Sequence, residues 1–396
     1  MENLKLENIE AIAILFIISI NSMILSTSQE LIKTCSSSSL ITASLVSILA
    51  ILIGLLFCTL SKNFPQKNLL DIADFIGGKI FKFTVGLLFI IYFTFRASLF
   101  LKKISDCLQL VYYPMTNVLF ISLLFCIAAG IVLSLKNNSL FKVSVLIMPI
   151  ILTSVLLIFI GNCKNFNFEN IFPILGNGTK STFVSGLSNI YTFYGLGYLL
   201  FIPDKLKHPE KIRKIALISI SLSALFLIIS SANILFLFGE KFSNTEFFPL
   251  YISVRSIEFG TFFERLDAMF LLICILVFIS ALILNAYTVL DIFKNITNIS
   301  NSNPLIFAYV LFILGLTMCY KLNSTVYFLE TTLSKSLLLI FGITIPFIIL
   351  VWANIKKKIV GGKEWKNLFY LELLYWLFLL LHMFFLLPII LKIWIV

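Results

Sequence analysis

Long apolar runs separated by short polar breaks dominate the chain. A membrane-spanning helix needs about 20 mostly apolar residues to cross about 30 Å of hydrocarbon. We predict ten spans of this kind at residues 9–27, 40–60, 80–101, 118–135, 143–161, 183–202, 215–238, 263–290, 304–320 and 337–355. An eleventh candidate, residues 368–391, contains Glu372 and His382. Glu372 is costly in lipid unless it faces protein, so this helix depends on a protein neighbour.

The composition excludes a soluble enzyme. Apolar residues make up 60% of the chain and charged residues 12%, against about 25% charged in soluble domains. The formal net charge is +11. In so apolar a chain, we assign the basic residues to the cytoplasmic membrane face and not to nucleic acid. The seven Cys lack CxxC spacing and the two His lie far apart, so no disulfide framework, metal site or cofactor is expected.

The charged residues also predict the orientation of the chain. Glu2, Glu7 and Glu10 accompany Lys5 before the first run, and no small-residue cleavage site follows it, so the first run is a span and not a cleaved signal. With the N-terminus inside, the cytoplasmic segments collect more Lys and Arg than the outer ones, including the run at 205–214. Basic residues translocate poorly, which favours a cytoplasmic N-terminus.

Two spans carry polar or flexible sequence at a point where a helix can break. The first reads Asn21-Ser22 after an apolar stretch. These side chains compete for backbone hydrogen bonds, and both residues are candidate ligand-binding residues. The sixth combines glycines that disfavour continuous helix with aromatics that can wall a pocket. Its candidate ligand-binding residues are Tyr191, Phe193, Tyr194, Gly195 and Gly197. The alternative is that such small residues serve close helix packing.

The first and sixth spans open two sets of five that run in opposite directions. This is the inverted-repeat arrangement, in which the broken first helices of both halves point their termini at a solute near the midplane. We therefore predict an all-α polytopic membrane protein with a ten-helix, five-plus-five transporter-like fold. Its parts are residues 1–161, residues 162–357, and a C-terminal extension at 358–396. Tyr92 on the third span is a further candidate pocket wall.

Charged residues near span ends have two readings. Glu264, Arg265 and Asp267 open the eighth span, and the two acids three residues apart lie on one face. Acids at a helix N-terminus are also favoured by the helix dipole, which gives a purely structural explanation. We expect Arg96, near the outer end of the third span, to extend to the headgroups.

Several segments resemble one known family. The run from Glu264 to Asp267, preceded by the aromatic loop 247–251, is similar to the spore germination permease family, the B subunits of nutrient germinant receptors. Residues 170–178 and Phe193-Tyr194-Gly195 followed by Pro203 agree with it. The similarity covers roughly residues 5 to 357. Two departures concern the ligand: Asn21-Ser22 stands where a Gly-rich break is expected, and Gly197 where relatives often have an acid.

The resemblance implies membership of the amino acid, polyamine and organocation transporter superfamily. It also implies a small nutrient, usually an amino acid, as ligand, and assembly with an A subunit and a lipoprotein C subunit in the spore inner membrane. Glu264, Arg265 and Asp267 would then act in assembly or signalling.

Two functions remain open from the sequence. The first is a nutrient-sensing subunit whose ligand binds between spans 1, 3, 6 and 8, with exposed amides of the first span holding a carboxylate of the ligand. The alternative is an amino acid transporter coupled to protons or sodium, which needs an ionisable or oxygen-rich group at mid-membrane, where acids are scarce. A membrane enzyme is not expected, because the chain has no GxSxG elbow or phosphate-binding loop.

Overall fold

The computed structural model describes residues 5–135, 139–245, 248–257, 266–297, 299, 303–320, 329 and 333–360. These residues are helical almost throughout, and the one strand-like contact among them is a parallel bridge between Leu6 and Leu206. The α-helices are α1 Asn8–Ser22, α2 Ser28–Cys35, α3 Ser39–Ser61, α4 Leu69–Val111, α5 Val118–Ser134, α6 Ser139–Asn162, α7 Gly195–Tyr198, α8 Ile212–Thr245, α9 Pro249–Arg255, α10 Leu266–Thr297, α11 Asn303–Cys319, α13 Ser334–Leu337 and α14 Ile345–Val360.

Short π-helical and 3-10 segments join or interrupt these helices. The π-helical ones are η1 Met23–Thr27, η5 Ser181–Ser185 and η11 Leu338–Thr344. The 3-10 ones are η2 Ser36–Ser38, η3 Cys163–Asn165, η4 Phe168–Ile171, η6 Gly186–Thr192, η7 Leu199–Phe201, η8 Pro203–Lys205 and η9 Pro209–Lys211. The candidate eleventh helix at 368–391 lies outside the described residues.

The described helices fit a membrane protein in length and surface. Six helical stretches are long and apolar enough to cross a membrane, and α1, α5 and α11 are shorter apolar helices. The predicted span at 183–202 is divided among η5, η6, α7 and η7. Large apolar side chains such as Leu52, Ile91, Leu157, Leu276 and Phe307 are exposed on the outer faces. A surface of this kind suits lipid contact, because water-soluble proteins rarely expose extended apolar patches.

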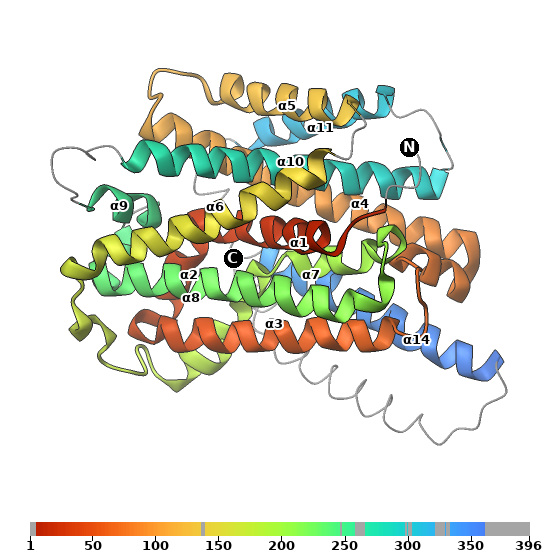
Figure 1. The fold of residues 1–396 in the computed structure, drawn as a ribbon, viewed down its shortest axis with the longest axis horizontal. Coiled ribbons are helices and arrows are strands. Elements are labelled where there is room, and N and C mark those ends of the chain that lie inside the picture. Colours follow the sequence, from red (N-terminus) through yellow and green to blue (C-terminus); the bar gives the residue numbers. More distant parts are fainter. Residues whose placement is uncertain are drawn as a thin grey trace.

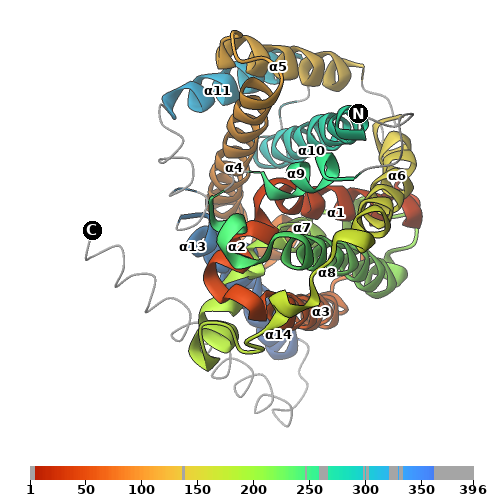
Figure 2. The same cartoon turned by 90° about the vertical axis from the view of Figure 1, so that its left-hand side faces the viewer.

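Helices that occupy equivalent places in the two halves of the chain pack against each other. The second span of the first half, α3, packs on α8; the third, α4, on α10; and the fourth, α5, on α11. Near the centre α1 packs on α7. In Figures 1 and 2, α5 and α11 lie together on one side of the molecule and α3 and α14 on the other, with α1, α7 and α8 between them. This pairing is what two related five-helix halves would produce.

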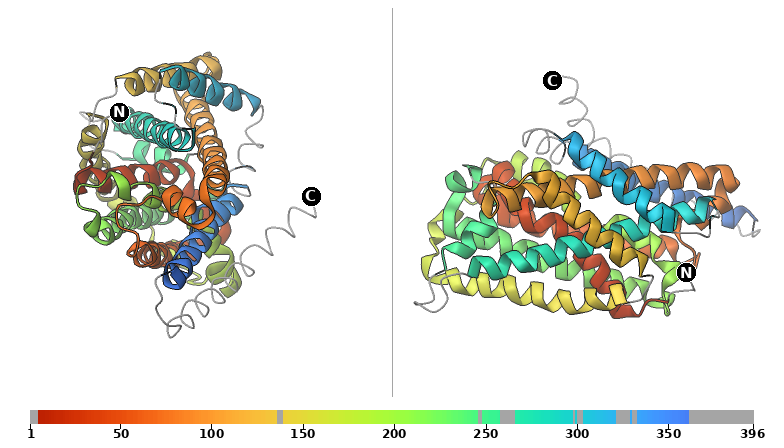
Figure 3. Two further views of the ribbon diagram at one scale, coloured as in Figure 1. Left: turned by 90° about the vertical axis from the view of Figure 1, so that its right-hand side faces the viewer. Right: turned by 90° about the horizontal axis from the view of Figure 1, so that it is seen from above.

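The N-terminal segment is fixed to the loop that follows the sixth span. The backbone N–H of Leu6 donates to the Lys205 carbonyl oxygen at 2.7 Å, and that of Lys207 donates to the Leu6 carbonyl oxygen at 3.0 Å. The Lys207 ammonium pairs with the Glu7 carboxylate, and this pairing lowers the pKa of Glu7. The basic loop after the sixth span therefore lies at the same end of the bundle as the N-terminus (Figure 3).

Candidate functional site

The sixth span is interrupted at the predicted place. The segment η6 ends at Thr192, Phe193 has a non-helical conformation with φ −82° and ψ 53°, and helical backbone resumes with α7 at Gly195. Side chains on both sides of the interruption are almost fully buried. The break thus faces protein and not lipid, which is the setting in which interrupted backbone is tolerated inside a membrane.

The first span changes its helix type and does not unwind. Its predicted weak point coincides with the π-helical segment η1, and the flanking residues Ser22 and Ser28 keep right-handed helical backbone. The Thr27 hydroxyl donates to the Ser22 carbonyl oxygen at 2.8 Å. The expectation of free helix 1 amides that hold a carboxylate therefore needs correction. A π-helical turn still engages its backbone N–H groups, and π-bulges are common at functional sites.

Ser22 connects the two unusual segments. Its hydroxyl lies 2.6 Å from the carbonyl oxygen of Thr192, and Thr192 is the last residue before the break in the sixth span. The same hydroxyl lies 2.8 Å from the Ser19 carbonyl oxygen. A carbonyl freed by a helix break needs a donor, because nothing in lipid can provide one. Ser22 provides that donor, so its contact in this structure is structural.

Gly195 and Gly197, two residues apart, differ in their surroundings. A Cβ atom added at Gly195 would lie 2.7 Å from the Leu15 backbone oxygen, so α1 passes too close for any side chain. At Gly197 the nearest atom would be 3.8 Å away, in ordinary van der Waals contact. The close-packing explanation therefore holds for Gly195, while Gly197 leaves room beside Phe93 and Tyr92.

Of the predicted aromatic residues, the structure brings Tyr92 and Tyr194 together. Their ring centroids are 5.6 Å apart, and Tyr92 stacks on Phe341 at 5.4 Å. Tyr198 lies 5.2 Å from Tyr194, and Phe100 lies 5.9 Å from it. All these rings except Phe341 are buried, so they form an aromatic cluster between α4 and the broken span.

Tyr191 and Phe193 are placed differently. The Tyr191 ring lies 5.4 Å from the Lys335 ammonium, which pairs with the Glu30 carboxylate at 3.0 Å. Tyr191 therefore belongs to a contact among α2, η6 and α13. Phe193 is buried at the break itself, with 1% of its surface exposed.

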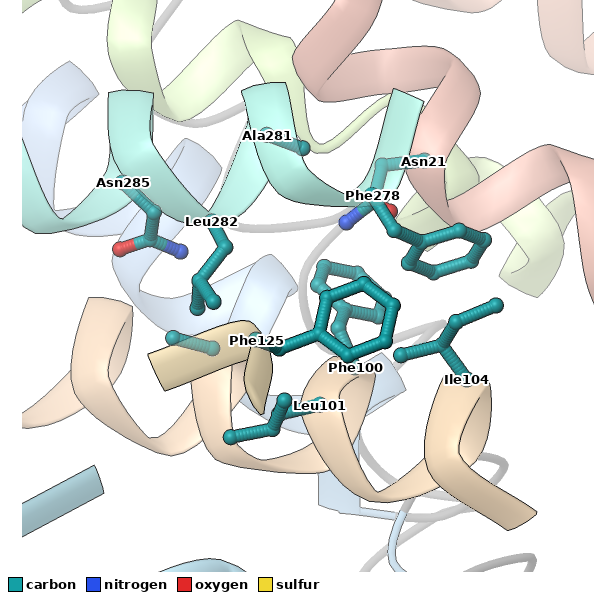
Figure 4. A pocket seen from close by; sticks show the side chains of 10 residues that line it. Asn21, Phe100, Leu101, Ile104, Phe125, Phe278, Ala281, Leu282 and Asn285 are labelled. Atoms are coloured by element: carbon teal, nitrogen blue, oxygen red, sulfur yellow. The ribbon is translucent and has the colours of Figure 1, made fainter. Parts of the chain in front are cut away.

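A small cavity lies beside the aromatic cluster. Its volume is about 10 Å³, which is room for about one water molecule. Figure 4 shows its side chains converging from α1, α4, α5 and α10. The lining residues are Asn21, Ala97, Phe100, Leu101, Ile104, Phe125, Phe278, Ala281, Leu282 and Asn285. The carboxamide oxygens of Asn21 and Asn285 are buried and have no hydrogen-bond partner among the described residues. Asn21 is thus the predicted residue that reaches the cavity.

Arg96 contradicts the expectation from sequence. Its side chain does not extend to the headgroups, because only 1% of the residue is exposed. The guanidinium lies 4.5 Å from the centre of the Phe100 ring and 4.6 Å from that of Tyr194. Its three nitrogens have no hydrogen-bond partner among the described residues. The position of Arg96 near the end of a predicted apolar run suggested the interface, whereas α4 in fact continues to Val111.

The two ring contacts do not compensate for this buried charge. An unsatisfied buried donor costs about 1–3 kcal/mol, and the Arg96 donors lie on three nitrogens that have no hydrogen-bond partner among the described residues. A cation–π contact returns about 0.5–2 kcal/mol. Arg96 is therefore an energetically unfavourable residue in the closed bundle, and such residues in membrane proteins mark functional sites.

Residues 5–326 match the spore permease family, whose members are described as spore germination proteins. The chain belongs to this family. Spore germination protein YndE from Bacillus subtilis strain 168 is 23% identical to this spore permease over 337 residues, which are 82% of this chain and 90% of YndE. The resemblance found in the aromatic and acidic segments is thereby confirmed.

Two solved structures of the transporter Mhp1 share the fold of this spore permease. Mhp1 in an inward-facing conformation has a TM-score of 0.58 and 12% identity, over 87% of this chain and 76% of Mhp1. The second structure is a closed conformation of Mhp1, a nucleobase-cation-symport-1 family transporter, with bromovinylhydantoin bound. Its TM-score is 0.59 and its sequence identity 14%, over 88% of this chain and 78% of Mhp1. The predicted all-α, transporter-like fold is confirmed.

Asp267 of this spore permease forms a structural contact at the far end of the bundle from the N-terminus. Its carboxylate accepts hydrogen bonds from the Tyr251 hydroxyl at 3.1 Å and the Tyr112 hydroxyl at 3.3 Å. These bonds join the start of α10 to α9 and to the end of α4. Its sequence neighbours Glu264 and Arg265 lie outside the described residues.

We predict that Gly195→Ala destabilises the protein and Gly197→Ala does not. Overpacking at Gly195 against the Leu15 backbone oxygen is expected to lower the free energy of unfolding by about 1–3 kcal/mol. Thermal unfolding of the two purified variants in detergent measures the difference. Equal thermal midpoints would show that α1 is not tightly packed at this glycine.

We predict that Asp267→Asn lowers the thermal midpoint of the purified protein. The neutral amide weakens bonds that a carboxylate accepts, by about 1–2 kcal/mol in total. Tyr112→Phe, which removes one of the two donors, should have a smaller effect. An unchanged midpoint in Asp267→Asn would show that these two bonds do not stabilise the bundle.

Proposed function

We propose that this spore permease is the integral membrane subunit of a spore nutrient germinant receptor. A small nutrient, such as an amino acid, binds between the first, third, sixth and eighth spans and triggers germination. The observation that carries the proposal is the interrupted sixth span, which packs beside a cavity with two unpartnered carboxamide oxygens. Family membership and the fold shared with a transporter that binds a small molecule support it.

In the proposed assembly the subunit lies in the spore inner membrane, with its N-terminus in the cytoplasm and with A and lipoprotein C subunits as partners. The basic residues at the N-terminal end of the bundle support this orientation. The halves 1–161 and 162–357 supply the two sides of the ligand site, and the extension 358–396 follows them. Asn21, Tyr92, Tyr194 and Gly197 are the sequence candidates that lie at or beside the cavity and its aromatic cluster.

Transport of an amino acid coupled to protons or sodium is the second candidate, favoured by the fold shared with a cation symporter. Proton coupling requires a carboxylate that changes its charge. Asp106, a buried acid of α4, pairs with Lys102 at 2.6 Å, and Glu30 pairs with Lys335 at 3.0 Å. Both carboxylates are already neutralised by a cation, which favours sensing over coupled transport.

We predict that filling the cavity raises the nutrient concentration required for germination. Ala281→Leu adds three carbon atoms at the cavity wall, so we expect at least a tenfold shift of the dose–response curve in spores, corresponding to about 1.4 kcal/mol. The matched control Ala308→Leu makes the same change on the lipid-facing side of α11. Protein amounts in the spore membrane are compared in both strains.

An unchanged dose–response in Ala281→Leu, with normal protein amounts, would place the ligand elsewhere. Uptake of labelled amino acids into proteoliposomes that contain only this chain separates the two candidate functions. Uphill uptake driven by a proton or sodium gradient would show that the chain is a coupled transporter and would refute the receptor proposal.

A further inference from the structure

The buried cationic side chains of the helical bundle differ in whether they have a carboxylate partner. Lys102 and Lys335 each lie within 3.0 Å of a carboxylate oxygen. Arg96 is more buried than either, with 1% of its surface exposed against 8% and 9%, yet it has no ion pair among the described residues. A residue kept for structure would be expected to have a partner of this kind. The Arg96 guanidinium instead keeps its charge and its N–H donors without a polar partner in the described part of the chain.

The position of Arg96 excludes the alternative that it serves the membrane surface. Its guanidinium touches Tyr194, and Tyr194 follows the break in the sixth span, which lies in the interior of the bundle. It also touches Phe100, and Phe100 lines the cavity. The cation, unpaired among the described residues, is thus one side chain away from the cavity beside the aromatic cluster.

We propose that Arg96 binds the carboxylate of the nutrient, so that the ligand class is a small organic acid that also carries a hydrogen-bond donor. The planar guanidinium presents parallel N–H groups that match the two oxygens of a carboxylate. The unpartnered oxygens of Asn21 and Asn285 accept from the donor, which is the ammonium group of an amino acid or the hydroxyl of a hydroxy acid. This proposal rests on the proposed function, because it names the chemistry of the same ligand site.

The sequence expectation assigned the carboxylate to amides of the first span, and the structure favours a different group. The backbone flanking η1 remains helical, whereas none of the three side-chain nitrogens of Arg96 has a hydrogen-bond partner in the part of the chain that the structure describes. Charge recognition by the third span also explains how this chain can do without an acid near Gly197. An anionic group of the ligand is held by Arg96, and its donor is met by neutral carboxamides.

The test uses the full-length chain purified in detergent and compares matched acid and amide pairs. L-alanine is paired with L-alaninamide, L-valine with L-valinamide, and L-lactate with L-lactamide, together with the uncharged nutrients glucose and inosine. The thermal midpoint is measured at rising concentrations of each compound, because a ligand that binds the folded state raises it. Chloride and inorganic phosphate are included to separate a carboxylate site from a general anion site.

We expect one or more of the acids to raise the midpoint of the wild-type chain, and its amide to have no effect. Arg96→Met should weaken binding of that acid at least 30-fold, and Arg96→Lys, which keeps a point charge but not the fork, about tenfold. Without ligand, Arg96→Met should unfold at the same or a higher temperature than the wild type, because it removes an uncompensated charge. Arg213→Met, at an exposed position at the start of α8, is the control.

Several outcomes would overturn the proposal. It is overturned if acid and amide bind equally, if Arg96→Met keeps the wild-type affinity for the acid, or if chloride or phosphate produces the whole shift. A large fall in the unliganded midpoint of Arg96→Met would identify a structural cation instead. If glucose or inosine binds and still binds to Arg96→Met, the carboxylate proposal is refuted and the receptor function remains. If no compound raises the thermal midpoint, both the carboxylate proposal and the proposed function are refuted.

Discussion

A helix that breaks inside a membrane leaves backbone groups that lipid cannot satisfy, and much of this structure follows from that constraint. Around the break in the sixth span, the N–H groups of Phe193, Leu196 and Gly197 donate to carbonyl oxygens three residues earlier. The Thr192 carbonyl needs a donor from another helix, and Ser22 supplies it. This contact requires α1 to approach closely, which the missing side chain at Gly195 permits. The glycine and the serine therefore work as one unit, although they lie in different halves of the chain.

The positions of the spans could be predicted from the lengths of the apolar runs, because the thickness of the hydrocarbon layer sets the length of a span whatever its sequence. The sixth break was predicted from Gly195 and Gly197, although both glycines lie in helical α7 and the interruption falls just before them, at Phe193. The sequence did not predict which aromatic residues would pack together. In an unbroken helix Tyr191 and Tyr194, three residues apart, would share a face. The non-helical backbone at Phe193 separates them, so Tyr194 joins Tyr92 while Tyr191 meets Lys335. A break can be read from sequence more readily than the turn of the chain that it causes.

Arg96 was misplaced for a related reason. A sequence shows how far a charge lies from the end of an apolar run, and it does not show which face of the helix carries the charge. The third span extends from Gly78, where the backbone of α4 is kinked, to Val111, so Arg96 lies well inside the helix and on the face that meets Tyr194. The signal available in the sequence was the charge itself, since an arginine within a long apolar membrane helix usually marks a functional site.

The small cavity and the uncompensated arginine together constrain how a ligand could act. About 10 Å³ admits a water molecule and no nutrient, so binding requires the walls of α4 and α10 to move. A ligand shifts a conformational equilibrium only by the difference between its affinities for the two states. In the proposed function, the state that opens the cavity to a carboxylate is also the state in which Arg96 gains its missing partner. The free energy that the closed bundle loses through an unpaired charge would then contribute directly to the difference between the two states. A chain with a neutral residue at this position would be more stable when empty and would have less to gain from its ligand.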